Sequence, residues 1–126
     1  MKIAIFYGST TGNTEYAAEK IHQSLQGHVS HLADISITDP EEFLDYDVLI
    51  LGIPTWDVGQ PQMDWETFMP KMADLNLTGK KIALFGMGDS AVYSLNFLDA
   101  LWLLWNLIIQ LGSPKLIGIL PVEGYE

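Results

Sequence analysis

The stretch Gly8-Ser9-Thr10-Thr11-Gly12-Asn13-Thr14 follows a hydrophobic run, Ile3 to Tyr7, and precedes a helical pattern that begins near Glu15. Its hydroxyls and backbone N–H groups would converge at a helix N-terminus, where unpaired amides and the positive end of the helix dipole favour an anion. The loop contains no lysine or arginine, so neutral donors would hold that anion. Such a site suits a phosphate monoester at the edge of a larger ligand better than a triphosphate with magnesium. The alternative is a Ser/Thr-rich turn that only caps a helix.

Hydrophobic strands and helical patterns alternate along the rest of the chain. Apolar runs predict strands at 3–7, 29–35, 47–53, 80–86 and 115–120, the second of them a weaker edge strand. Helical spacing predicts helices from near residue 15 to Gly27, at 64–72 and at 97–111. A further short helix has Asp39 as N-cap and Pro40 at its first position. This order predicts an α/β fold with a parallel sheet and right-handed crossovers.

Two more loops follow strands of this predicted sheet. A ligand of a parallel sheet binds beyond the carboxyl ends of the strands, at the point where the winding direction switches. Trp56 lies in the proline- and glycine-bounded loop 54–61, and Tyr93 lies in the loop 87–96. Aromatic rings in such loops are well placed to stack on a flat ligand. The alternative for Trp56 is a ring folded back over the hydrophobic edge.

Composition restricts the class of protein and of partner. The length of 126 residues and the hydrophobic content of 48% predict one domain, residues 1–126, with a single core. Sixteen acidic against six basic residues give a net charge of −10, which disfavours nucleic acid or an anionic membrane surface as partner and favours a basic protein.

The cysteine content, the N-terminal sequence and the histidine spacing bear on disulfides, signal peptides and metal sites. The chain has no cysteine, which excludes disulfides, thiol catalysis and cysteine-ligated clusters and agrees with a cytoplasmic location. No signal-peptide pattern precedes the first strand. His22, His28 and His31 lack the spacing of metal ligands, so we expect no metal site.

Taken together, these motifs resemble those of the flavodoxins, and in particular the long-chain type. Residues 8–15 are similar to the family's phosphate loop, residues 47–56 to its third strand and first flavin-stacking loop, and residues 85–89 with Tyr93 and Asn96 to its second such loop. The resemblance runs from Met1 to Glu126 and implies a doubly wound, five-stranded parallel sheet of order 2-1-3-4-5.

The resemblance also implies a cofactor and a set of residues that bind it. The ligand would be flavin mononucleotide (FMN), with Trp56 and Tyr93 on opposite faces of the isoalloxazine ring. The peptide after Trp56, at Asp57-Val58, would flip on reduction of the flavin. The implied cofactor-binding residues are Ser9, Thr10, Thr11, Gly12, Asn13, Thr14, Pro54, Thr55, Trp56, Asp57, Val58, Gly59, Gly88, Asp89, Tyr93 and Asn96.

By the same resemblance the protein is a low-potential one-electron carrier and not an enzyme. It would shuttle electrons between a reductase and acceptor proteins, with basic redox partners such as a flavodoxin reductase docked on its acidic surface. Acidic residues near the flavin disfavour the addition of negative charge to the ring and therefore lower its potential.

The chain departs from the family at its C-terminus. Gly124-Tyr125 matches a family motif after which flavodoxins complete the fifth strand and add a final helix, whereas this sequence stops at Glu126. The predicted fold therefore lacks that helix, whether the sequence is a fragment of a longer protein or a naturally shortened one. In addition, the predicted helix 97–111 is apolar nearly all round, so its outer face would pack against a second copy or another partner; ordinary surface hydrophobes are the alternative.

Two other functions stay open from the sequence. One is a flavodoxin-like NAD(P)H-dependent quinone or flavin reductase, which would need a second pocket for nicotinamide and quinone. The other is a non-redox binding module that has lost FMN. A nucleoside triphosphate site is disfavoured, since no Gly-Lys-Ser/Thr sequence follows the loop.

Overall fold

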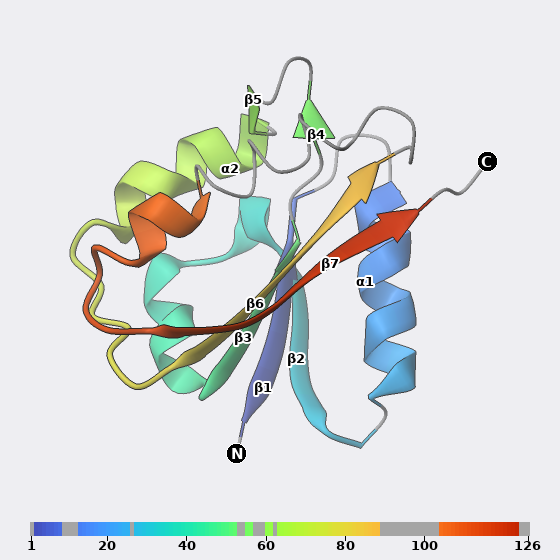
Figure 1. The fold of residues 1–126 in the computed structure, drawn as a ribbon, viewed down its shortest axis with the longest axis horizontal. Helices are drawn as coiled ribbons and strands as arrows, with labels where there is room; N and C mark the ends of the chain where they lie inside the picture. The colour runs from blue at the N-terminus through green and yellow to red at the C-terminus, as the bar shows by residue number, and fades with distance from the viewer. Residues whose placement is uncertain are drawn as a thin grey trace.

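A five-stranded, all-parallel sheet forms the centre of the molecule (Figure 1). The structure is a computed structural model that describes residues 2–8, 13–25, 27–52, 55–56, 60–61, 63–88 and 104–123. The sheet has the order β2-β1-β3-β6-β7. Its strands are β1 (Ile3–Tyr7), β2 (Val29–Asp34), β3 (Val48–Gly52), β6 (Lys81–Gly88) and β7 (Lys115–Glu123). Counted along the chain, this is the predicted order 2-1-3-4-5, and the predicted fold class is confirmed.

The two central strands carry continuous apolar runs because both of their faces are covered. Residues 4–7 of β1 and all of β3 are buried, and the two strands pair in register from Ile3 opposite Val48 to Tyr7 opposite Gly52. The edge strand β2 is only partly buried along most of its length. The predicted contrast between buried central strands and a weaker edge strand is therefore confirmed.

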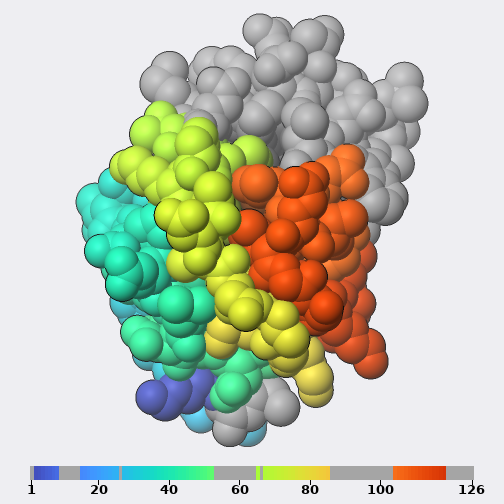
Figure 2. Space-filling model, turned by 90° about the vertical axis from the view of Figure 1, so that its left-hand side faces the viewer, coloured from blue at the N-terminus to red at the C-terminus, as the bar shows by residue number. Residues whose placement is uncertain are grey.

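Helices cover the two faces of the sheet. α1 (Asn13–Ser24) lies on one face, whereas α2 (Met63–Phe68), the 3₁₀ helices and the helical residues 104–108 lie on the other (Figure 1). The 3₁₀ helices are η1 (Ile35–Ile37), η2 (Pro40–Asp45) and η3 (Met69–Met72). Figure 2 shows this second face, on which segments 63–72 and 104–111 pack side by side.

Two hydrophobic clusters correspond to these two faces. The larger one lies under α2 and the 3₁₀ helices and includes the fully buried Phe6, Phe43 and Trp65. The smaller one lies under α1 and joins Ala17 and Ala18 to side chains of the central strands. Alternate residues of β1, β3 and β6 pack into opposite clusters, as the pleat of a strand requires.

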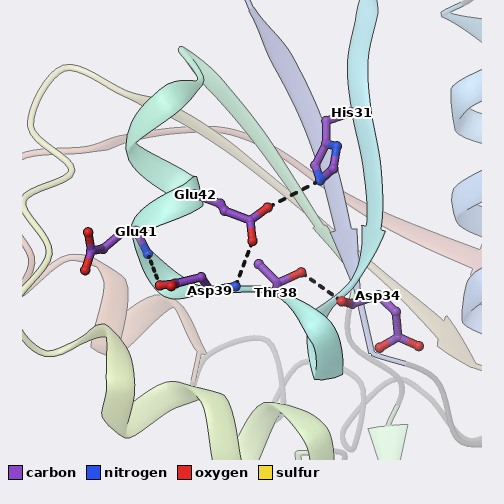
Figure 3. A network of polar contacts seen from close by, with 6 residues as sticks. All are labelled: His31, Asp34, Thr38, Asp39, Glu41 and Glu42. Carbon is purple, nitrogen blue, oxygen red and sulfur yellow. Dashed lines mark hydrogen bonds and ion pairs between the residues drawn. The ribbon is translucent and has the colours of Figure 1, made fainter.

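The predicted start of the short helix after residue 38 is confirmed in detail (Figure 3). Asp39 is the N-cap of η2, and its carboxylate accepts a hydrogen bond from the Glu41 N–H at 3.1 Å. In turn, the Glu42 carboxylate accepts a hydrogen bond of 2.8 Å from the Asp39 N–H. The two bonds together form a capping box. The other Glu42 oxygen lies 3.6 Å from Nε2 of His31 on β2.

Two predicted helices have different bounds in the structure. The predicted helix 64–72 is an α-helix only to Phe68 and continues as 3₁₀ through Met72, because Pro70 has no N–H for an α-helical bond. Within the predicted helix 97–111, residues 104–108 are helical and the helix ends at Ile108; residues 97–103 lie outside the described part of the chain.

The described residues of the predicted helix 97–111, which are 104–111, turn most of their apolar side chains inward. Leu104, Ile108 and Leu111 are buried, and Trp105 and Leu107 pack against the core. Ile109 is 44% exposed. Self-association through residues 97–111 therefore stays a prediction. In the portion that the structure describes, no helix is both long and apolar enough to cross a membrane.

Candidate functional site

Strands β1 and β3 leave the sheet side by side, and this places two of the predicted ligand loops together. Tyr7 pairs with Gly52 at the last position of both strands. The N–H of Gly8 then donates a 3.0 Å hydrogen bond to the Gly52 carbonyl. β1 also pairs with β2 on its other side, so the direction of winding switches at β1. Ligands of such sheets bind at this point.

The phosphate-loop prediction concerns the connection between β1 and α1. Its last two residues, Asn13 and Thr14, are the first residues of α1, so a helix N-terminus follows directly on the loop as predicted. The first-turn amides of a helix lack intrahelical partners and favour an anion. Glu15 is the acidic residue of this first turn.

The first aromatic loop contains two short strands that the sequence analysis did not foresee. β4 (Thr55–Trp56) pairs antiparallel with β5 (Gln60–Pro61), with Trp56 opposite Gln60. These strands form a second, two-stranded sheet. The connection of three residues ending in Gly59 was the available signal, because glycine is favoured at the last position of such hairpin loops.

The second aromatic loop follows β6, which pairs with β3 on one side and with β7 on the other. Gly88 is the last residue of β6. The three predicted loops therefore leave the carboxyl ends of three adjacent strands, β1, β3 and β6. This common edge is what the sequence analysis predicted.

Sixteen cofactor-binding residues were predicted, and five of them lie in described elements: Asn13, Thr14, Thr55, Trp56 and Gly88. The remaining predicted residues lie outside the described part of the chain: Ser9, Thr10, Thr11, Gly12, Pro54, Asp57, Val58, Gly59, Asp89, Tyr93 and Asn96. The binding roles of all sixteen residues stay predictions.

Tyr7 belongs to this edge although the sequence analysis gave it no role. Its side chain is only 8% exposed, and its hydroxyl is hydrogen-bonded to the Glu15 side chain in the first turn of α1. Burial, followed by the charges of Glu15 and Asp34, raises the pKa of Tyr7 to about 12. The neutral hydroxyl therefore persists at physiological pH and ties the end of β1 to the start of α1.

Trp65 is a second residue that the sequence analysis did not assign to the site. This fully buried tryptophan of α2 donates from Nε1 to the Gly52 carbonyl at 2.7 Å. No local sequence signal predicts the bond, because its partners lie 13 residues apart on different elements.

Other features of the described residues do not compete with this edge as a site. A cavity of about 100 Å³ lies between η1 and α2, but none of the predicted cofactor-binding residues line it. Its lining residues are Ile35, Ser36, Thr38, Thr67, Phe68 and Lys71. Within the described ranges, no three or more His, Cys, Asp or Glu side chains group as metal ligands would.

Comparison with known proteins identifies the family. The sequence profile described as Flavodoxin matches residues 5–120 of this chain. Flavodoxin 2 of Salmonella typhi is 48% identical over 126 residues, which cover 100% of this chain and 72% of that protein.

Solved structures agree with that assignment. Oxidised flavodoxin 1 of Bacillus cereus superimposes with a TM-score of 0.84 at 29% identity, covering 100% of this chain and 86% of the other. A flavodoxin variant of Fusobacterium nucleatum, bound to flavin mononucleotide, has a TM-score of 0.81 at 25% identity, covering 92% of this chain and 67% of the other. With the profile match over residues 5–120 and the parallel sheet of matching order, the chain belongs to the flavodoxin family.

Proposed function

We propose that the chain binds FMN at the carboxyl ends of β1, β3 and β6 and carries single electrons between a reductase and acceptor proteins. Flavodoxins are electron-transfer flavoproteins and not enzymes. The observation that carries the proposal is the hydrogen bond from Gly8 to Gly52, which brings the stems of the first two loops together at the switch point of the sheet.

The helix N-terminus that directly follows the loop supports a phosphate site at the start of α1. The Gly8 N–H is already engaged by the Gly52 carbonyl, so the donors for phosphate must come from the residues that follow it. Those residues, Ser9 to Thr14, supply four hydroxyls and lead directly into the first turn of α1. FMN supplies the redox chemistry when bound, and the chain's own residues bind it, orient it and limit its contact with water.

The aromatic residues complete the proposed site. Trp56 lies in β4, within the short hairpin sheet that follows β3, and Tyr93 belongs to the connection that follows β6. We assign these two rings to opposite faces of the flavin. A hairpin is a more rigid support for a stacking ring than an irregular loop, which lowers the entropy lost on binding.

Charge separation along the sheet supports a basic redox partner. Lys2, Lys80, Lys81 and Lys115 lie at the amino ends of β1, β6 and β7, on the edge opposite the proposed site. The stretches 21–70 and 82–114 include the two aromatic loops and contain no lysine or arginine. With a net charge of −10, the molecule would present its negative end to a partner and orient a basic one on approach.

Titration of the purified chain with FMN and with riboflavin tests the proposal. We expect saturable quenching of flavin fluorescence by the protein, with much tighter binding of FMN than of riboflavin, since only FMN has the phosphate. Reduction of the complex in two resolved one-electron steps would support the carrier role. A folded sample that quenches neither flavin would contradict the proposal.

A further inference from the structure

The Gly52 carbonyl accepts two hydrogen bonds from distant parts of the chain. The backbone N–H of Gly8 lies 3.0 Å from this oxygen, and Nε1 of Trp65 lies 2.7 Å from it. A backbone carbonyl has two lone pairs, so both of its acceptor positions are filled. This one oxygen thus fixes the positions of Gly8 after β1 and of the Trp65 side chain on α2 relative to the end of β3.

Trp65 is held rigidly at this contact. Its side chain is fully buried, and its ring packs edge-on against Phe68 at a centroid distance of 5.7 Å and an interplanar angle of 85°. A buried indole N–H without a partner would lose its hydration with no compensation, so the bond to Gly52 fixes one orientation of the ring.

The same bond closes the segment that contains the first aromatic hairpin. Gly52 precedes that segment and Trp65 follows it, so the chain from 53 to 64 starts and ends at one hydrogen bond. β4 and β5 lie within this closed segment. Fixing the two ends of a loop lowers the conformational entropy that the loop loses when it orders around a ligand.

From these contacts we propose that Trp65 is a positioning residue for the flavin ring: its indole N–H, through the Gly52 carbonyl, sets the hairpin that carries Trp56. This inference rests on the proposed FMN site. The phosphate loop has its own contact to Gly52 through the N–H of Gly8, and this bond does not involve Trp65. Loss of that bond should therefore weaken contacts to the ring system and leave the phosphate contribution intact.

The test replaces Trp65 by β-(3-benzothienyl)alanine, which keeps the ring shape and removes only the N–H, and in parallel uses Trp65→Phe. Affinities for FMN and for riboflavin are measured by fluorescence titration. We expect both affinities to fall by the same factor, about tenfold, so that their ratio stays at the wild-type value. The benzothienyl variant keeps the test valid if Trp65→Phe does not fold.

Phe43→Leu is the matched control. Phe43 is fully buried in the same cluster but belongs to η2 and packs on Phe6 and Phe68. It should lower the unfolding temperature while both flavin affinities stay within twofold of wild type. If Phe43→Leu lowered the affinities for FMN and riboflavin by the same factor as the Trp65 variants do, general destabilisation would explain the Trp65 result. That outcome would overturn the inference.

Two further outcomes would also overturn the inference. One is a folded benzothienyl variant with wild-type flavin affinities, and the other is a loss confined to FMN, which would place the effect on the phosphate loop. These results differ from failure of the proposed function, in which the wild-type chain itself binds neither flavin.

Discussion

The ring of Phe85 occupies the space that a side chain at Gly52 would need. A Cβ built on Gly52 would lie 2.2 Å from Cζ of Phe85 and 2.7 Å from both Cε atoms. Phe85 lies opposite Gly52 in the β3–β6 pairing and is fully buried, so its ring has little room to move away. The glycine at the end of β3 is therefore required by packing between neighbouring strands.

Gly52→Ala should accordingly destabilise the fold. Overpacking of this kind costs about 1–3 kcal/mol in the free energy of unfolding, measured by urea denaturation. Gly118→Ala on β7 is the control, because no atom lies within 4 Å of its added Cβ. The double variant Gly52→Ala/Phe85→Leu should lose less stability than the two single variants together. Strict additivity would argue against the clash as the cause.

Removal of the Tyr7 hydroxyl should change the alkaline stability of the protein. The pKa of Tyr7 in the folded protein is about 12, above its ordinary value of 10.0. A raised pKa contributes stability below pH 10 that is lost as the pH rises toward 12, by up to roughly 3 kcal/mol for a shift of this size. Tyr7→Phe has no hydroxyl that titrates, so it should not lose this stability as the pH rises from 10 toward 12.

The measurement for Tyr7 is urea unfolding at several pH values between 8 and 12. Glu15→Gln provides an intermediate case, because it removes one of the charges that raise the pKa of Tyr7 and leaves the ring buried. Stability profiles that coincide for wild type and Tyr7→Phe would refute the assignment.

The capping box of η2 predicts a second local effect. Asp39→Ala removes the carboxylate that accepts from the Glu41 N–H, and should cost about 1 kcal/mol of unfolding free energy. Glu41→Ala is the matched control, since Glu41 contributes its backbone N–H to the cap and its side chain points away from the network (Figure 3). Equal losses in the two variants would contradict a capping role for Asp39.

The contact between Asp47 and the backbone of Lys2 predicts sensitivity to acid. The Lys2 N–H donates to the Asp47 carboxylate at 2.8 Å, and this bond is the main cause that lowers the pKa of Asp47 below its ordinary 3.8. A lowered pKa gives stability that is present above the ordinary pKa and is lost as the pH falls through the lower value. Asp47→Asn should therefore be less stable than wild type at pH 7 and lose less on acidification.

Thermal unfolding at pH 7 and pH 3 measures this effect. Asp45→Asn is a suitable control, because Asp45 is an exposed carboxylate only two residues away at the end of η2. An Asp47→Asn profile parallel to that of wild type at both pH values would exclude the proposed contribution of this bond.

The sequence was sufficient to predict the sheet because its signals are local. The continuous apolar runs of β1 and β3 follow from burial on both faces, and Asp39 with Pro40 determines the start of η2 within a few residues. The common edge of the three predicted loops then follows from parallel strands and right-handed crossovers. The parallel sheet and the stems of the site were thus predictable from local signals, whereas the strand order 2-1-3-4-5 came from the resemblance to the flavodoxins.

Contacts that depend on three-dimensional arrangement were not predictable in this way. The bonds of Gly52 to Gly8 and Trp65 join segments with no shared pattern, and the Tyr7–Glu15 bond depends on how α1 packs on β1. The end of the last helix was predicted at Leu111, but the carbonyl of Leu111 accepts from the N–H of Leu77 in the structure. This tertiary contact agrees with a helix that ends earlier, at Ile108.

The strands of the sheet end at different heights at their carboxyl ends. β3 ends at Gly52 opposite Phe85, whereas β6 and β7 continue as a pair through Gly88 and Glu123. At about 3.3 Å per residue, these three further pairs rise roughly 10 Å above the neighbouring strand ends. A flat ligand bound beyond the ends of β1 and β3 would therefore have the extended pair of strands β6 and β7 along one of its sides.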